Sequence, residues 1–159
     1  MKLSVVIPVY NSEKILNTLI NSIKKNIKIK KNLFEIILVN DFSSDNSWKK
    51  IIKFKRNNNF IKAINLGKNY GQHYAIFLAL KSLGIKKEDE VIVPDITFAA
   101  TANAVNLCGA KTVLVDVSKE SLTIDVNLLE KKINSKTKAI IPVHVSGRGA
   151  EMKKILKIA

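Results

Sequence analysis

The sequence has little cysteine, few acidic residues and no long apolar run. Its one cysteine, Cys108, cannot form a disulfide within the chain, which agrees with a reducing compartment. No apolar run approaches the ~20 residues that cross a bilayer. The N-terminus shows no small-residue cleavage pattern of the kind that follows a signal peptide. We therefore expect a cytoplasmic protein.

Arginine is also scarce, since Arg56 and Arg148 are the only two among 27 basic residues. Only 13 acidic residues oppose them, and the formal net charge is +14. Nucleic-acid binders usually gather arginine with aromatics on one face, whereas these lysines are spread over several predicted helices. We interpret the lysines as a solvated coat and disfavour nucleic acid. The second interpretation is weak attraction to anionic lipid headgroups, which would place the protein at the periphery of the inner membrane.

Short apolar runs alternate with amphipathic stretches along the whole chain. Such alternation predicts an α/β fold, a three-layer αβα sandwich with a mostly parallel, Rossmann-like sheet of about six strands. If the fourth strand docks beside the first, the strand order is 3-2-1-4, with the last two strands continuing outward. The predicted strands cover residues 3–9, 34–39, 60–66, 90–94, 111–115 and 138–143, and the later helices residues 70–83, 98–107, 126–133 and 150–158.

Polar residues follow the first three predicted strands, where ligands bind in an open parallel sheet. The Asp41 carboxylate can accept a hydrogen bond from the imide N–H of a uracil, and Tyr10 can lie against the base. Lys68 can reach a diphosphate, and Gly67 and Gly71 let the backbone approach such a ligand closely. We expect a nucleoside diphosphate or a nucleotide sugar as the partner.

The blocks SVVIPVYNSE, IILVNDFSSDNS and NLGKNYGQHYAIFLAL, in this order and spacing, resemble family 2 glycosyltransferases of the GT-A fold. The resemblance covers residues 1 to about 80 and is closest to the branch that transfers a sugar to a polyprenyl phosphate. Phe42 departs from the family, which usually has glycine there, so the turn after Asp41 is expected to be altered. The resemblance implies a nucleoside pocket lined by Pro8, Tyr10, Asn11, Glu13 and Asp41, with Lys68 near the phosphates.

A purely structural interpretation accounts for some of these residues. Ser43, Ser44 and Asp45 are explained as well by capping of the following helix as by ligand binding. The other residues form an ordered set over three strand ends, which capping does not explain.

The metal motif of the GT-A fold is not matched. By resemblance, Mg or Mn would be held by an Asp-x-Asp motif after the fourth strand and would neutralise the departing diphosphate. The sequence there is EVIVPDITF, in which Ile96 and Thr97 follow Asp95. We assign no metal site and do not expect this polypeptide alone to transfer a sugar.

From about Leu80 the chain resembles a second family, the DegT/DnrJ/EryC1/StrS pyridoxal-phosphate sugar aminotransferases. The stretch from ALKSLGIKKEDEVIVPDITFAATANAV to PVHVSGRGAEMKKI carries this resemblance. It implies that Phe98 stacks on the cofactor and that His144 and Gly147 lie near the active site, while Arg148 departs from the usual amide-type residue. The alternatives are a core aromatic for Phe98 and a structural strand-end histidine for His144.

The Schiff-base lysine, its partner aspartate and the phosphate loop of that family are not matched, so transamination by this chain is not expected. The sequence predicts a join near residues 77–82, between a nucleotide-binding segment (1–80) and an aminotransferase large-domain segment (81–159). The main functional hypothesis is a glycosyltransferase-like, nucleotide-sugar-binding fragment from cell-envelope polysaccharide or glycolipid biosynthesis. The alternatives are an aminotransferase fragment and an inert remnant of a gene fusion. The sugar, base, acceptor and oligomeric state stay open.

Overall fold

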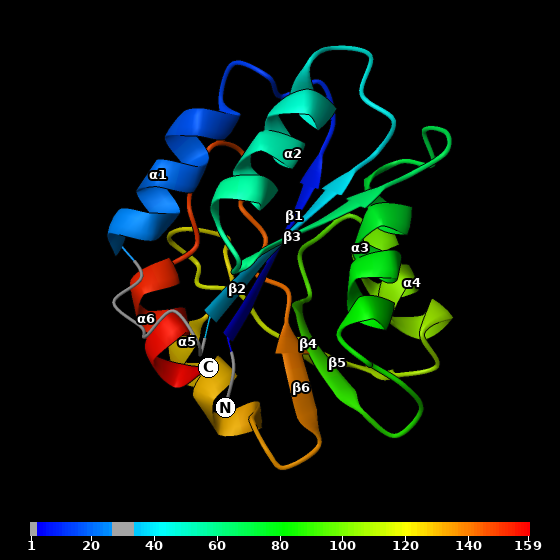
Figure 1. Ribbon diagram of the computed structural model, residues 1–159. Coiled ribbons are helices and arrows are strands. Elements are labelled where there is room, and N and C mark those ends of the chain that lie inside the picture. The colour runs from blue at the N-terminus through cyan, green and yellow to red at the C-terminus, as the bar shows by residue number, and fades with distance from the viewer. Residues whose placement is uncertain (1–2, 27–33) are drawn as a thin grey trace. The chain divides into compact units, whose positions relative to one another are not determined.

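The computed structural model describes residues 3–26 and 34–159 (Figure 1). The chain divides into two compact units, one ending at Ala79 and one beginning at Leu80, and the division falls inside α3. The elements up to that helix are β1 (Leu3–Val9), α1 (Leu16–Asn26), β2 (Phe34–Asn40), α2 (Ser47–Asn57), β3 (Ile61–Asn65) and α3 (Gln72–Ser82). The later elements are β4 (Glu90–Pro94), α4 (Ala100–Leu107), β5 (Lys111–Val115), α5 (Val126–Lys132), β6 (Thr137–Ile140) and α6 (Met152–Ile158).

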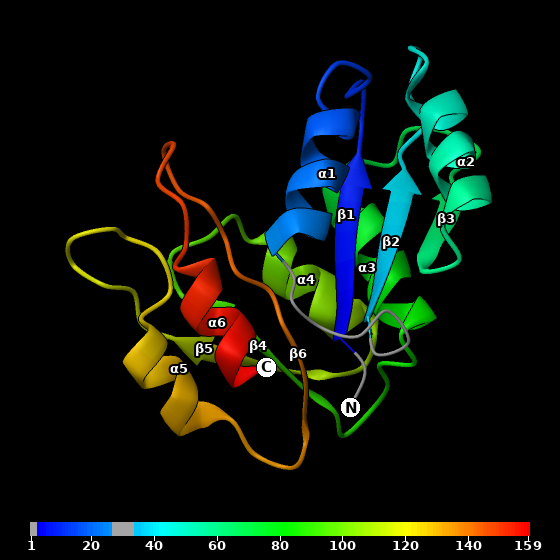
Figure 2. The same cartoon turned by 60° about the vertical axis from the view of Figure 1, so that its left-hand side comes forward.

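The first unit contains a parallel three-stranded sheet in the order β1-β2-β3. β2 is central and buried along its whole length, as its apolar residues from Ile36 to Val39 predict, and the buried Glu35 is paired with Ser4 and Lys62. Leu16 and Ile20 of α1 and Ile51 of α2 pack with Ile36 and Leu38 of β2 in one cluster. The helices α1 and α2 therefore cover the same face of this sheet (Figures 1 and 2).

The second unit contains a parallel three-stranded sheet in the order β5-β4-β6. Ile92 of β4 packs with Leu129 of α5 and Ile155 of α6 on one face, where the two helices lie together (Figure 2). The helix α4 contacts β4 and β5. Val91 and Val93 point to the face opposite Ile92 because side chains alternate along a strand, and both are fully buried.

The predicted α/β class, the six strands and the parallel pairing within each sheet are confirmed. The grouping of the strands differs from the prediction. We expected a single sheet of about six strands, and the strands form two sheets of three. The predicted 3-2-1 order holds within the first sheet, but β4 does not follow as its fourth strand. Instead β4 is the central strand of its own sheet, and its two hydrogen-bonding edges are taken by β5 and β6.

Several element ends follow local chemistry. Gly84, with φ of 81°, follows the end of α3, and the Ile85 N–H donates to the carbonyl of Leu80. The Asp125 carboxylate caps α5 by accepting from the N–H groups of Asn127 and Leu128 at 2.8 and 3.3 Å. These caps fix where the loops leave the helices.

Candidate functional site

Asn11 joins the loop after β1 to the loop after β2. Its side-chain oxygen accepts from the Ser44 N–H at 2.9 Å and from the Ser44 hydroxyl at 3.2 Å. Its backbone N–H donates to the Ser43 hydroxyl at 3.0 Å. Asn11 adopts φ of 44°, a left-handed conformation that asparagine tolerates better than most residues. The Asn11 side chain therefore connects the loops after two strands.

Glu13 makes a second connection between the same two loops. Its N–H donates to Asp45 Oδ2 at 3.0 Å, and its Oε2 accepts from the backbone and side chain of Asn46, each at 3.2 Å. Lys50 Nζ donates to the Glu13 carbonyl at 2.9 Å and lies 3.8 Å from its carboxylate. Because its carboxylate is engaged in this way, Glu13 acts by shaping the loop.

Asp45 has a lowered pKa. Partial desolvation opposes its ionisation, but hydrogen bonds from the Ser47 hydroxyl and from the backbone of Glu13 and Ser47 outweigh that cost and lower the pKa of the carboxyl. Asp45 is therefore an anion that holds the start of α2 against the loop after β1.

Asp41 links the end of β2 to the loop after β3. The side chain is buried, only 3% of the residue is exposed, and Oδ1 accepts from the Tyr70 N–H at 2.8 Å. Within residues 3–26 and 34–159, no donor to the second oxygen, Oδ2, is found. No buried side-chain oxygen of the described residues lacks a hydrogen-bond partner, so Oδ2 reaches solvent and can accept from a ligand N–H or O–H in place of water.

Aromatic and cationic side chains lie exposed on the same strand-end loops. Tyr10 is 53% exposed after β1, and Tyr70 is 40% exposed after β3. Lys68 Nζ lies 5.0 Å from the Tyr70 ring centroid, a cation–π contact, and the Tyr70 ring stacks on Tyr74 at 4.7 Å. Pro8 is exposed near the end of β1. These loops thus combine an open aromatic face, a cation and a buried carboxylate.

Three contacts of Asn40 at the strand ends could not be predicted from the sequence. The Ser43 hydroxyl donates to Asn40 Oδ1 at 2.6 Å, and Asn40 Nδ2 donates to Asn65 Oδ1 at 2.7 Å. Leu66 N–H donates to the Asn40 carbonyl at 2.9 Å. Asn40 therefore joins the ends of β2 and β3. The available signal was an asparagine at the end of each of two apolar strands.

Phe42 bears the backbone strain that the family's usual glycine would avoid. Its φ is 55°, in the left-handed region, and its ring is 55% exposed. The turn keeps a conformation that suits glycine, while the phenylalanine side chain gains little burial in return.

In the second unit, Phe98 lies two residues before the start of α4 and is 70% exposed, so its ring face is open to a flat ligand. The core alternative for Phe98 does not agree with this exposure. The neighbouring Thr97 and Thr101 hydroxyls lie 3.0 Å apart. One aromatic face fits a pyridine ring but does not bind a phosphate. An exposed ring alone therefore fits one face of a pyridine, and we derive no step through pyridoxal phosphate.

His144 lies in the loop after β6. Its Nδ1 accepts from the Ala150 N–H at 3.0 Å, which leaves Nε2 as the protonated nitrogen of the neutral ring. Arg148 lies in a tight turn that also contains Gly147 at φ of 77°, and it exchanges backbone hydrogen bonds with Val145 at 3.1 and 2.8 Å. His144 thus stabilises this turn, as the structural alternative predicts.

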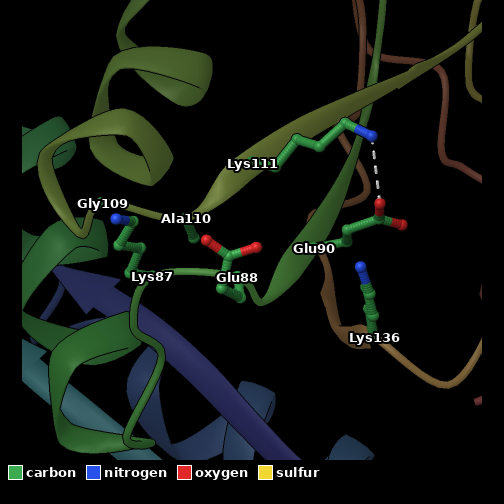
Figure 3. Close-up of a pocket in the computed structure, with 7 residues that line it drawn as sticks. All are labelled: Lys87, Glu88, Glu90, Gly109, Ala110, Lys111 and Lys136. Carbon is green, nitrogen blue, oxygen red and sulfur yellow. Dashed lines mark hydrogen bonds and ion pairs between the residues drawn. The ribbon is translucent and has the colours of Figure 1, made fainter.

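A hollow of about 440 Å³ lies at the opposite, amino-terminal edge of the second sheet (Figure 3). Glu90 in this hollow is bound by Asn134 at 2.8 Å and by Lys111 at 3.1 Å, and these two hydrogen bonds lower the pKa of its carboxyl. The lining contains none of the residues predicted to bind nucleotide or cofactor. Its residues are Lys87, Glu88, Glu90, Gly109, Ala110, Lys111 and Lys136.

The described residues contain neither a cluster of metal ligands nor a membrane-spanning helix. Within residues 3–26 and 34–159, no group of three or more histidine, cysteine, aspartate or glutamate side chains is arranged to hold a metal ion. In the same part of the chain, no helix has the length and apolar character needed to cross a membrane.

Known proteins resemble the second unit over about half of this chain. GDP-perosamine synthase of Caulobacter vibrioides is 47% identical over 85 residues, which are 54% of this chain and 23% of that protein. A UDP-N-acetyl-3-dehydro-alpha-D-glucosamine 3-aminotransferase of Acidithiobacillus ferrooxidans is also 47% identical over 85 residues, and the match again covers 54% and 23%. The chain therefore spans less than a quarter of the length of these relatives.

A solved structure shows the same likeness. DesV of S. venezuelae, in complex with a ketimine intermediate, matches with a TM-score of 0.54 and 41% identity over 55% of this chain and 24% of that one. The model of glycosyl transferase family 2 matches residues 4–83, and the model of the DegT/DnrJ/EryC1/StrS aminotransferase family matches residues 71–159. Each match covers just over half of the 159 residues, so the chain belongs to both families, to the first through its N-terminal part and to the second through its C-terminal part.

Proposed function

We propose that this chain recognises nucleotide sugars, and that its first unit binds the nucleoside diphosphate portion at the loops after β1, β2 and β3. The observation that carries this proposal is the state of Asp41. One carboxylate oxygen is anchored at 2.8 Å by the Tyr70 N–H, and the other has no described donor. A nucleobase imide N–H can donate to that second oxygen in place of water, and the exposed Tyr10 ring supplies a stacking surface.

The polar connections between loops support the same proposal. Asn11, Glu13 and Asn40 hold three strand-end loops through side-chain hydrogen bonds, so the loops are ordered before a ligand arrives. Preorganisation lowers the entropic cost of binding. Lys68 lies on the third loop, where its ammonium can meet a diphosphate.

Calorimetric titration of the full chain with UDP, with and without Mg²⁺, tests this function. Saturable binding is expected, and Asp41→Ala is expected to abolish it. Asp95→Ala is the matched control, because Asp95 also follows a strand and removing it changes the charge equally. Absence of binding of UDP and of other nucleoside diphosphates would overturn the proposal, as would equal losses in the two variants.

For the second unit we propose descent from a nucleotide-sugar aminotransferase. Its similarity to enzymes of this kind supports the proposal. The Acidithiobacillus relative is named as an aminotransferase of a UDP-linked sugar. Exposed Phe98 is the residue proposed to stack on pyridoxal phosphate. Titration with pyridoxal phosphate, followed by visible absorbance, should give a saturable signal that Phe98→Ala weakens and the matched aromatic variant Phe42→Ala leaves unchanged. If the absorbance signal is the same in both variants, it comes from nonspecific adducts of pyridoxal phosphate with lysines, and the proposed role of Phe98 is wrong.

We also propose that the two parts were joined within α3, in a chain whose lineages serve cell-envelope polysaccharide or glycolipid synthesis. Both family models cover residues 71–83, which include the whole of that helix. Sequencing the locus tests the join, because two separate full-length genes there would contradict it. If neither UDP nor pyridoxal phosphate binds, the third interpretation, an inert fusion remnant, replaces the functional ones.

A further inference from the structure

Positive charge is distributed unequally between the two units. Residues 1–79 contain 14 lysines and arginines against 4 acidic residues, whereas residues 80–159 contain 13 against 9. The acids of the first unit are already engaged. Glu35 pairs with Lys62 at 3.0 Å, while Asp41, Asp45 and Glu13 accept hydrogen bonds from the strand-end loops. Little negative charge in this unit is left to balance its outer surface.

The helix α2 concentrates this charge on its outer side. At about 100° per residue, Lys49, Lys53 and Arg56 fall within about 60° of arc and form one stripe along the helix. Ile51 points the opposite way and is fully buried. We call Lys49, Lys53 and Arg56 the cationic ridge; all three are exposed, and no ion pair involves them within the described residues.

The ridge is unfavourable for the isolated helix. The sequence SWKKIIKFKRN contains no acidic residue, and like charges at i and i+4, such as Lys49 and Lys53, repel. Lys55 adds a further exposed cation. Such a surface is stabilised when an anionic surface lies against it.

We propose that the cationic ridge of α2 docks the protein on an anionic lipid bilayer. Three cations in line on a convex helix suit a plane of lipid phosphates. Lysine predominates, and the aromatic residues of α2, Trp48 and Phe54, pack against the core, so the ridge offers no stacking face for bases. These features favour lipid over nucleic acid.

Vesicle co-sedimentation of the full chain tests the docking. The protein should pellet with vesicles containing about 30 mol% phosphatidylserine, but not with neutral vesicles, and about 1 M salt should release it. The triple variant Lys49→Gln/Lys53→Gln/Arg56→Gln should reduce the partition coefficient roughly 10- to 100-fold. The matched control, Lys131→Gln/Lys132→Gln/Lys153→Gln, removes the same charge from exposed helical positions of the second unit and should stay within about threefold of the wild type.

Each other outcome overturns the proposal. Equal losses in the two triple variants would mean that the overall charge, and no particular surface, attracts lipid. Binding to a DNA or RNA duplex that depends on the ridge, without vesicle binding, would assign the ridge to nucleic acid. Circular dichroism of each variant establishes that the fold is retained, and the single variant Lys53→Gln provides a milder test if a triple variant unfolds.

Discussion

The two units differ in how their strand-end loops are held. In the first unit, Asn11, Glu13 and Asp41 each bridge loops that follow different strands. In the second unit, the corresponding edge exposes Ile96 and Phe98, and Thr97 bonds to Thr101 of the adjoining helix. The first edge is a network built from several strands, whereas the second is local and presents apolar surface. The strand-end loops of the first unit are therefore held to one another by polar side chains, whereas Ile96 and Phe98 at the corresponding edge of the second unit are exposed.

The largest expected effect comes from truncating one buried side chain in the core of each unit. Ile51→Ala in the first unit and Leu129→Ala in the second each remove a fully buried side chain, which should cost about 2–5 kcal/mol of unfolding free energy. Trp48, the single tryptophan, packs against the first core, so its fluorescence reports that unit alone. Ile51→Ala should lower the denaturant midpoint of the fluorescence transition, and Leu129→Ala should leave it in place while lowering part of the circular dichroism transition. If both variants shift both signals equally, the chain unfolds as one cooperative unit.

The next effect concerns Asp41 at the strand-end loops of the first unit. Asp41→Asn keeps an acceptor for the Tyr70 N–H but removes the charge, so nucleoside diphosphate affinity should fall about tenfold or more, while stability changes little. Calorimetry measures the affinity and thermal unfolding the stability. If Asp41→Asn binds nucleoside diphosphates with unchanged affinity, the Asp41 charge does not contribute to binding.

A helix cap distinguishes the second unit. Asp125→Ala removes two hydrogen bonds at the start of α5 and should cost about 1 kcal/mol of stability. Far-ultraviolet circular dichroism during urea unfolding measures this cost, with Asp125→Asn as the control that retains an acceptor. If Asp125→Asn loses as much stability as Asp125→Ala, the loss comes from the missing charge and not from the missing hydrogen bonds.

Phe42→Gly should be neutral or stabilise the first unit by up to about 1 kcal/mol. Relief of a left-handed φ of 55° outweighs or offsets the added chain entropy of glycine, and the exposed ring contributes little burial. Trp48 fluorescence during urea unfolding measures this change in the stability of the first unit. A clear loss of stability would show that the Phe42 ring makes contacts worth more than the strain.

The smallest effect is a pH dependence in the second unit. The pKa of Glu90 is lowered by hydrogen bonds from Asn134 and Lys111, so its contribution to stability is present above the ordinary glutamate pKa of about 4.3 and is lost as pH falls through the lowered pKa. Glu90→Gln should therefore be less stable than the wild type near neutral pH, and the two should converge in acid. A difference that persists unchanged in acid would refute the ionic origin.

Much of the fold could be predicted from pattern. The central apolar strands, the α/β alternation and the stop at Gly84 follow from periodicity and backbone preferences that act over a few residues. The site was predictable only as a set of strand-end residues. Which loops Asn11, Glu13 and Asp41 join depends on which strand ends meet in the fold, and no local pattern encodes that. Asn40 was missed because an amide at a strand end has no signature until its partner on the next strand is known.

By itself, the sequence determined the elements, the charge imbalance and the two family memberships, because each depends on residue identity and order. Only the tertiary structure decided that six parallel strands form two sheets and that β4 takes β5 and β6 as its neighbours. Each strand edge has several possible partners, and these partners are far apart in the sequence. Which partner it takes depends on which apolar faces can be buried together, and that is a property of the folded chain.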